Sequence, residues 1–313
     1  MKERGQLMLI SLATLISLGI FFLLTHMEVC QHLFGRLIGR QAKQIFPVVH
    51  NAAVASRLCS KRREVLYGIF SIPRKAHTWA VVRQQLQCEF NNDIHSTVFV
   101  VGTPRSESDQ EIVMRESKSR GDVFILTCDE NMNEGKSFTY FKEALEQFPC
   151  FNFYAKVDDD TAFVPNKLSA RILNVSNEGP LFIGRNSRVL DSYFNKFVIK
   201  TFLFSFRDME WISHIQNYTA GLLYILNSQA EKKWVALNPT QLYGDEDYRT
   251  SYYMQQTGAT FVNLDTAFHD YLEYETNLFQ DHWKLEITQN SLAVHKCKTQ
   301  RQLTDAFTSV CTV

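Results

Sequence analysis

The chain has no excess of either charge, because 33 lysines and arginines balance 33 aspartates and glutamates over 313 residues. A nucleic-acid-binding surface needs clustered basic residues, and no such cluster stands out, so no nucleic-acid partner is expected. Low-complexity tracts and internal repeats are also lacking. The length suffices for one large domain or two smaller ones, each with a buried core.

Cysteine is scarce. The seven cysteines are too few and too scattered for a disulfide scaffold, and the absence of CxxC argues against a thiolate zinc site. Their odd number leaves at least one thiol free or paired between chains, and which of them pair stays open. They are residues 30, 59, 88, 128, 150, 297 and 311.

Apolar runs of membrane-spanning length are lacking after residue 24. Before it, QLMLISLATLISLGIFFLL (6–24) is uncharged and long enough to span a bilayer. No small-residue cleavage site follows, which predicts an uncleaved signal anchor. We therefore expect a short tail (1–5), a transmembrane signal anchor (6–24), a stem (25–60) and a domain (61–313). Basic residues flank both ends of the span, so they do not settle its orientation; sequons at Asn174 and Asn217 would be usable only in a lumenal domain.

From Val65 the chain alternates short apolar runs with helical patterns. Strands are predicted over 65–72, 96–102, 122–127 and 151–157, with helices over 76–90, 109–120 and 135–148 between them. This alternation indicates an α/β fold with a mostly parallel sheet covered on both faces. The second half is less regular and is expected to continue the sheet, with strands over 181–184, 220–228, 260–264 and 291–295 and helices over 228–237 and 245–256.

Three consecutive carboxylates, Asp158, Asp159 and Asp160, directly follow the predicted strand FNFYAKV. Carboxylates repel one another and are costly to hold together without a cation, and the carboxyl end of a strand is where open α/β sheets usually bind ligands. The triplet therefore predicts a divalent-metal site that holds a phosphorylated substrate. A solvated acidic turn is the alternative.

A second acidic cluster, Asp245-Glu246-Asp247, leads into a predicted helix. Asp245 suits the N-cap, because a carboxylate there satisfies free backbone N–H groups. Asp247 is the candidate general base, since a metal–nucleotide site needs a further carboxylate for proton transfer. His295 ends the apolar run SLAV; taken alone it is more typical of a hydrogen-bonded core histidine than of a metal ligand.

These motifs, in this order, resemble the inverting β1,3-galactosyl- and β1,3-N-acetylglucosaminyltransferases of glycosyltransferase family 31. The stretch NMNEGKSFTYFKEAL is most similar to the kinetoplastid UDP-galactose- or UDP-N-acetylglucosamine-dependent branch. The resemblance covers roughly residues 64 to 309. Its matches are VFVVGTP, Glu116, Gly121-Asp122-Val123, NMNEGKS with Lys136, Lys156-Val157-Asp158-Asp159-Asp160, Gly221-x-x-Tyr224, Glu246-Asp247-Tyr248 and Val294-His295-Lys296.

The resemblance implies a GT-A-like, Rossmann-like mixed sheet behind one transmembrane helix, in a type II Golgi membrane enzyme with a lumenal domain. It implies a UDP-galactose or UDP-N-acetylglucosamine donor, a glycan acceptor on a glycoprotein or glycolipid, and Mn²⁺, with Mg²⁺ possible. Residue by residue, it implies that Asp160 and His295 ligate the metal and that Asp247 is the base. Asp158 and Asp159 would bind the ribose or order metal-bound waters, with Gly221 also at the donor.

Lys136 is expected as a charge partner of the site, although a solvated lysine in the first helical turn is the alternative. Two other functions stay open. A haloacid-dehalogenase-type phosphatase also places Asp-x-Asp after an apolar strand, and Gly244-Asp245 imitates its later motif. A non-catalytic, membrane-anchored sugar-binding homologue is the second.

Overall fold

The computed structural model describes residues 46–61, 63–86, 94–175, 178–188, 217–239, 245–264, 267–270 and 290–312. The chain divides into two compact units, residues 1–48 and 49–313, and all the described strands belong to the second. The predicted anchor over 6–24 lies outside the described residues. Within those residues, every helix is too short or too polar to cross a membrane.

Helices and strands alternate through the first half of the second unit. In chain order the elements are α2 (Phe46–Leu58), β1 (Val65–Phe70), η1 (Pro73–Lys75), α3 (Ala76–Leu86), β2 (His95–Thr103), α4 (Glu107–Arg120), β3 (Val123–Asp129), α5 (Lys136–Gln147), β4 (Phe153–Asp158), β5 (Ala162–Phe163), α6 (Pro165–Leu173), β6 (Leu181–Arg188), β7 (Asn217–Asn227), α9 (Ser228–Leu237), α10 (Glu246–Gln256), β8 (Thr260–Asn263), β9 (Phe268–Asp270), β10 (Ala293–His295) and α11 (Gln300–Thr312).

Among the described residues, seven strands form one sheet in the order β3-β2-β1-β4-β7-β6-β8. Strands β1 to β4 run parallel, whereas β7 runs antiparallel to both β4 and β6. The sheet is therefore mixed, and the predicted α/β class is confirmed. The parallel half matches the regular strand–helix alternation, and the antiparallel half is where the sequence pattern becomes irregular.

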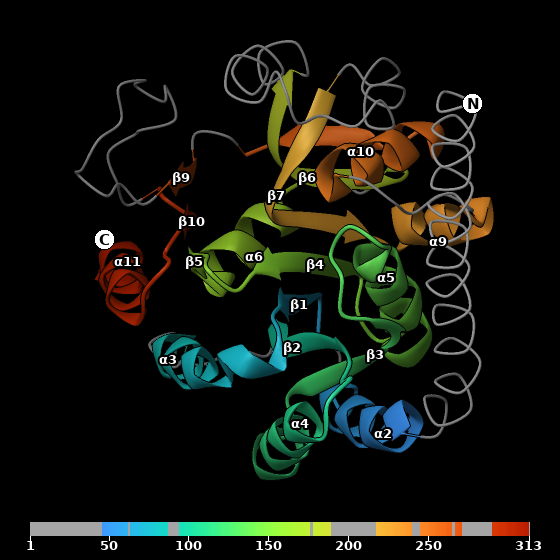
Figure 1. Cartoon of the computed structure of the whole chain (residues 1–313). Coiled ribbons are helices and arrows are strands. Elements are labelled where there is room, and N and C mark those ends of the chain that lie inside the picture. Colours follow the sequence, from blue (N-terminus) through green and yellow to red (C-terminus); the bar gives the residue numbers. More distant parts are fainter. Residues whose placement is uncertain are drawn as a thin grey trace, which may run out of the picture. The chain divides into compact units, whose positions relative to one another are not determined.

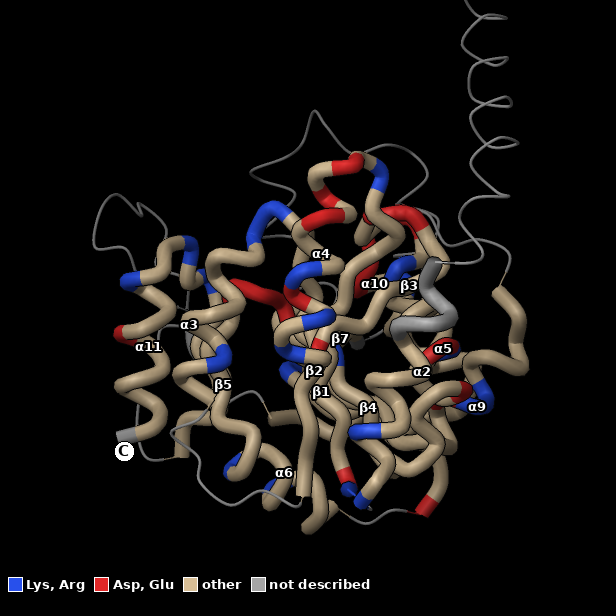
Figure 2. Tube along the Cα trace, turned by 90° about the horizontal axis from the view of Figure 1, so that it is seen from below, with Lys and Arg blue, Asp and Glu red and all other residues tan. Residues whose placement is uncertain are grey.

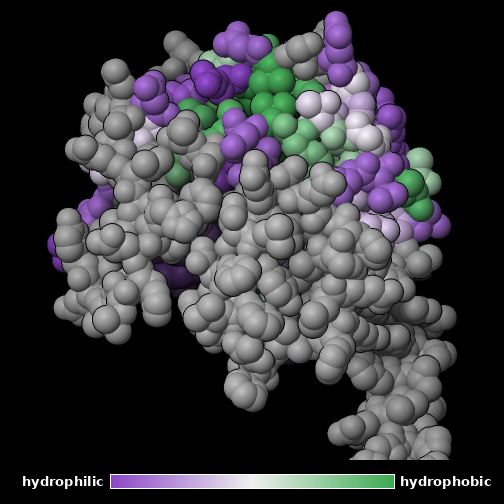
Figure 3. All heavy atoms as spheres, turned by 90° about the horizontal axis from the view of Figure 1, so that it is seen from above, coloured by the Kyte–Doolittle hydropathy of each residue, from purple (hydrophilic) through white to green (hydrophobic). Residues whose placement is uncertain are grey.

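Helices cover the sheet on both faces (Figure 1). On one face, α5, α9 and α10 bury an aromatic core in which Phe141 packs on Tyr224 and Trp234. On the other face, Trp79 of α3 stacks on Phe99 of β2. The helix predicted over 135–148 faces the sheet with its aromatic residues, since Phe141 and the C-cap residue Phe148 are fully buried. Outside, the described surface seen in Figure 3 carries hydrophilic side chains around a smaller apolar area.

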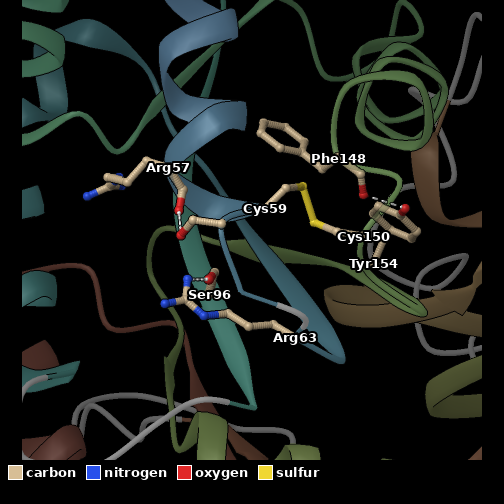
Figure 4. The surroundings of a disulfide bond; sticks show 8 residues. Arg57, Cys59, Arg63, Ser96, Phe148, Cys150 and Tyr154 are labelled. Carbon is tan, nitrogen blue, oxygen red and sulfur yellow. Dashed lines mark hydrogen bonds between the residues drawn. A yellow bond between two sulfur atoms is a disulfide. The ribbon is translucent and has the colours of Figure 1, made fainter.

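Helix α2 covers the edge strand β3. The Asn51 side chain donates to the carbonyl of Ile125 at 2.7 Å and accepts from its N–H at 3.1 Å, which satisfies backbone groups that an edge strand leaves open. A Cys59–Cys150 disulfide then joins the end of α2 to the turn before β4 (Figure 4). Residues 51–60, which fall in the predicted stem, thus pack with the sheet. Cys30 and Cys88 lie outside the described residues.

A small second sheet, in the order β5-β10-β9, brings the C-terminal region back to the end of β4. β10 pairs antiparallel with β5, so that Val294 lies opposite Ala162. Because Ala162 follows the acidic triplet by two positions, this pairing carries the next residue, His295, towards Asp160. Helix α11 packs beside β5 and α3 (Figure 1).

Candidate active site

The acidic triplet lies where the strand order of the sheet changes direction. β1, β2 and β3 progress to one side and β4 lies on the other, so the crevice beyond the carboxyl ends of β1 and β4 is the usual ligand position in such sheets. Phe70 pairs with Asp158, so Ser71 lies beside Asp159 and donates to its Oδ2 at 2.7 Å. Lys75 donates to the other oxygen of Asp159 at 2.7 Å. Asp159 is thus held by protein groups.

Asp158, Asp160 and His295 form a cluster that fits a metal ion. One ligand atom from each lies within 4.8 Å of the others. The Nε2 atom of His295 is 3.2 Å from Asp160 Oδ1 and 3.8 Å from Asp158 Oδ2. Two carboxylates and one imidazole are a donor set suited to Mn²⁺ or Mg²⁺. The core-histidine alternative does not describe His295, whose side chain is 20% exposed and faces carboxylates.

Lysines neutralise each carboxylate of the triplet. Lys156 contacts Asp158 at 2.9 Å, and the largely exposed Lys298 contacts Asp160. Although burial alone would raise the pKa of Asp160, His295 and Lys298 hold it below its usual value, so this carboxylate is ionised at neutral pH. Figure 2 shows acidic and basic residues gathered together near β2, β7 and α10.

The second acidic cluster begins α10. Asp245 occupies the N-cap position as expected, but its side chain accepts no capping hydrogen bond. Glu246 points into the protein, where it accepts from Ser137 at 2.7 Å, from Lys156 at 3.1 Å and from Tyr224. The carboxylate next to the predicted base is therefore a structural anchor that fixes the start of the helix.

Asp247 lies against β7. A Cβ atom at Gly221 would overlap the Asp247 carboxylate, so only a glycine admits this close approach. Burial, followed by the neighbouring charges of Glu246 and Asp245, raises the pKa of Asp247 well above its ordinary value. Such a carboxyl is a stronger proton acceptor than an exposed one, which suits a general base. The Gly221 carbonyl meanwhile accepts from Lys156 at 2.6 Å.

Lys136 is buried at the start of α5, with 1% of its surface exposed. Its ammonium donates to the Ser71 carbonyl at 2.9 Å and pairs with Glu130, whose other oxygen accepts from the Gly102 N–H at 2.5 Å. The solvated-lysine alternative is therefore wrong. Lys136 is linked to Asp159 through Ser71, whose carbonyl accepts from Lys136 and whose hydroxyl donates to Asp159.

The structure adds residues to which the sequence alone assigns no role: Ser71, Lys75, Glu246 and Lys298. Lys156 belongs to the Lys-x-Asp-Asp-Asp motif, yet the motif does not indicate what the lysine does. An apolar strand interrupted by one lysine was the available signal, because a buried lysine requires acidic partners. No comparable sequence pattern surrounds Lys75 or Lys298.

Two other motif residues, Glu116 and Asp122, lie elsewhere and pair with Arg83. Arg83 forms ion pairs with Asp122 at 2.7 Å and with Glu116 at 2.7 Å, while its guanidinium lies 4.8 Å from the Phe99 ring centre. These residues tie α3, α4 and the start of β3 together. The place of Glu116 and Asp122 in the motif set reflects packing of the fold.

A family model described as Galactosyltransferase matches residues 74–265, more than half of the chain. The chain belongs to this galactosyltransferase family. The matched galactosyltransferase region contains the acidic triplet at the end of β4, together with Lys136, Gly221 and Asp247. The predicted family is thereby confirmed, and the phosphatase alternative is not favoured.

This galactosyltransferase-family chain is similar to one curated protein in sequence and to several solved structures. A segment of 69 residues is 30% identical to the β-1,3-galactosyltransferase pvg3 of Schizosaccharomyces pombe, spanning 22% of this chain and only 18% of that protein. The galactosyltransferase LgtC, solved with donor and acceptor sugar analogues, is 9% identical with a TM-score of 0.43, covering 80% of this chain and 97% of LgtC. The mannosyltransferase PcManGT of Pyrobaculum calidifontis, solved with GDP-mannose and Mn²⁺, is 15% identical with a TM-score of 0.39. The match covers 72% of this chain and 66% of PcManGT.

Proposed function

We propose that this chain transfers galactose or N-acetylglucosamine from a UDP-sugar to a glycan acceptor, in β1,3 linkage and with inversion at the anomeric carbon. The domain would be GT-A-like. The supporting observation is that two carboxylates and a histidine fit a metal ion at the sheet's ligand-binding edge, while the partly buried carboxylate of Asp247, with a raised pKa, lies against Gly221, whose carbonyl accepts from Lys156.

Asp160 and His295 would hold the divalent cation, Mn²⁺ or Mg²⁺, and Asp158 is close enough to join them. When bound, such a cation stabilises the negative charge that gathers on a departing diphosphate. Asp159 is held by Ser71 and Lys75 and is not part of the three-residue metal cluster. Its role would therefore be to bind the ribose or ordered water. Lys298 is mostly exposed, so it can leave Asp160 and pair with a phosphate oxygen instead.

Asp247 accepts the proton of the acceptor hydroxyl as that oxygen attacks the anomeric carbon from the side opposite UDP. One displacement converts an α-linked donor into a β-linked product, and no covalent intermediate is needed. Glu246 holds the helix start through three hydrogen bonds, and Gly221 leaves room for the Asp247 carboxylate. The base is thereby oriented before the acceptor binds.

A type II Golgi location, with the domain lumenal, is part of the proposal. It rests on the apolar segment 6–24 and on the sequons at Asn174 and Asn217. A mass shift on glycosidase treatment of the expressed protein would support lumenal orientation. A protein that carries no glycan, and is protease-sensitive from the cytosolic side, would contradict it.

The test of the reaction is a transfer assay with the full-length chain in detergent. UDP-galactose and UDP-N-acetylglucosamine are supplied with Mn²⁺ and a panel of β-galactoside and mannoside acceptors, and the product linkage is read by NMR. A β1,3-linked product supports the proposal. A chain that binds UDP-sugar but neither transfers nor slowly hydrolyses it is instead the non-catalytic homologue.

A further inference from the structure

A second hollow lies at the opposite end of the strands from the candidate active site. Its volume is about 670 Å³, and its lining includes Arg57, Arg63, Arg83, Arg120, His95 and Asp122. Arg63 precedes β1, His95 begins β2 and Asp122 precedes β3, so the hollow lies at the amino ends of these parallel strands. The acidic triplet lies at the carboxyl end of β4, so the two sites are separate.

The lining carries an excess of positive charge. Arg83 is neutralised, because it donates to both oxygens of Asp122 at 2.7 and 2.8 Å. Arg57, Arg63 and Arg120 form no ion pair with any carboxylate in the part of the chain that the structure describes. Three guanidinium groups thus face one hollow with no anionic partner among the described residues, an arrangement that favours an anionic ligand.

Two buried nitrogen atoms of the lining also have no hydrogen-bond partner in the described part of the chain. Arg63 donates through Nη1 to Ser96, yet its Nε has no hydrogen-bond partner within the described residues, and neither has Nδ1 of His95. Buried polar atoms in folded proteins are nearly always hydrogen-bonded, so these two nitrogens mark a place where a polar ligand fits. An oxyanion would accept from Arg63 Nε, from the nearby guanidinium groups and from His95 Nδ1 in the tautomer that carries its proton there.

The disulfide holds this region in place. Cys59 lies between Arg57 and Arg63 in sequence and is bonded to Cys150. Figure 4 shows the guanidinium groups of Arg57 and Arg63 on the same side of the segment, directed away from the disulfide. Because Cys59, two residues after Arg57, is anchored, less ordering of this segment is needed when a ligand binds.

We propose that this hollow binds a phosphate ester, at a site distinct from the donor site. Arginine pairs with tetrahedral oxyanions through two parallel N–H···O bonds, which matches three unpaired guanidinium groups around one concavity. The ester can belong to a soluble molecule or to a lipid headgroup. Both present the same charged oxygens.

Calorimetric titration of the full-length chain tests the proposal. Inorganic phosphate, glycerol 3-phosphate and glucose 6-phosphate are titrated separately in EDTA, without UDP-sugar, so that the metal site does not contribute. Wild type is expected to bind at least one of them, and Arg57→Gln/Arg63→Gln to lose about tenfold or more in affinity. The compound that binds most tightly indicates which molecule carries the ester. Tightest binding of glycerol 3-phosphate indicates a lipid headgroup, and tightest binding of glucose 6-phosphate indicates a phosphosugar.

Two variants separate binding from folding. Arg57→Lys/Arg63→Lys keeps the charge but loses the planar fork, so it is expected to fold and to bind more weakly than wild type. Arg74→Gln removes an exposed arginine that pairs with Asp109 elsewhere and should bind as wild type does. A further readout is the His95 ring, whose NMR signals should shift on addition of phosphate. Absence of binding by all three anions, or equal affinity in wild type and both double variants, overturns the proposal.

Discussion

The ammonium of Lys156 lies 2.9 Å from Asp158 Oδ1 and 3.1 Å from Glu246 Oε2, so one buried lysine bridges the two acidic clusters. It also donates to the Gly221 carbonyl at 2.6 Å. Lys156 is 1% exposed, and its acidic partners raise its pKa well above the ordinary value despite the opposing effect of burial. The lysine therefore stays charged and fixes the candidate metal site relative to the candidate base.

Lys156→Met should disable the site and weaken the fold. Loss of one partner from a buried ion pair leaves an uncompensated charge and costs about 3–5 kcal/mol of unfolding free energy. We expect kcat to fall about 100-fold or more, because Asp158 and α10 lose their common support. Urea denaturation and steady-state kinetics measure the two effects. Lys142→Met, on the exposed face of α5, is the control, and a Lys156→Met enzyme with normal kcat would contradict the positioning role.

Gly221→Ala tests the close approach of Asp247 to β7. The added methyl group would overlap the carboxylate, so we expect kcat to fall about tenfold or more while the fold survives. Gly179→Ala is a matched control: nothing lies within 4 Å of its Cβ position, but its φ of 88° makes alanine cost about 1 kcal/mol. If both variants lose stability equally and neither loses kcat, Gly221 does not position the base.

Asp247→Asn should retain UDP-sugar binding and lose turnover by about 10²–10⁴-fold. The base must be ionised, and burial with the Glu246 and Asp245 charges raises its pKa, so wild-type kcat should fall as the pH drops through that raised value. The pH profile of kcat at saturating donor measures this. A normal Asp247→Asn enzyme beside an inactive Asp245→Asn enzyme would move the base to Asp245.

Burial of Glu231 on α9 should make the free energy of unfolding depend on pH. It is fully buried, both oxygens lack partners within the described chain, and burial raises its pKa well above the ordinary value. The folded state thus binds a proton that the unfolded state releases near pH 4, so the free energy of unfolding falls as pH rises from there through the raised pKa. Glu231→Gln should stabilise the protein by about 1–3 kcal/mol at pH 7.

Urea denaturation of wild type and Glu231→Gln at pH 4, 5.5 and 7 measures this difference, which should vanish at the lowest pH. Glu178→Gln, at an exposed position, should leave stability unchanged at each pH. A Glu231→Gln protein that is less stable than wild type at pH 7 would show that the carboxyl has a stabilising partner.

Local patterns were enough to predict most elements of the fold. The runs over 65–72 and 151–157 became β1 and β4 within two residues at each end, because each is a mostly apolar segment. The place of Asp158 at a strand end followed directly. Asp247 in the first turn of α10 was predictable for the same reason, since acidic residues favour helix starts.

Long-range pairings were not predictable. Lys156 meets Glu246 across 90 residues only because β7 runs antiparallel beside β4, and no local pattern encodes that register. His295 reaches Asp160 through a pairing with β5, a strand of two residues that is too short to give a signal. The Cys59–Cys150 bond spans 91 residues and depends on α2, which lies in the segment predicted to be a stem.

The most direct test of a metal-dependent donor site is the affinity of the full-length chain for UDP, measured by calorimetry with Mn²⁺ and again in EDTA. Wild type should bind UDP about tenfold or more tightly with Mn²⁺, and Asp160→Ala and His295→Ala should lose that difference, whereas His77→Ala, at an exposed position, should keep it. Equal UDP affinity with and without Mn²⁺, or an undiminished Mn²⁺ effect in Asp160→Ala, would contradict the account.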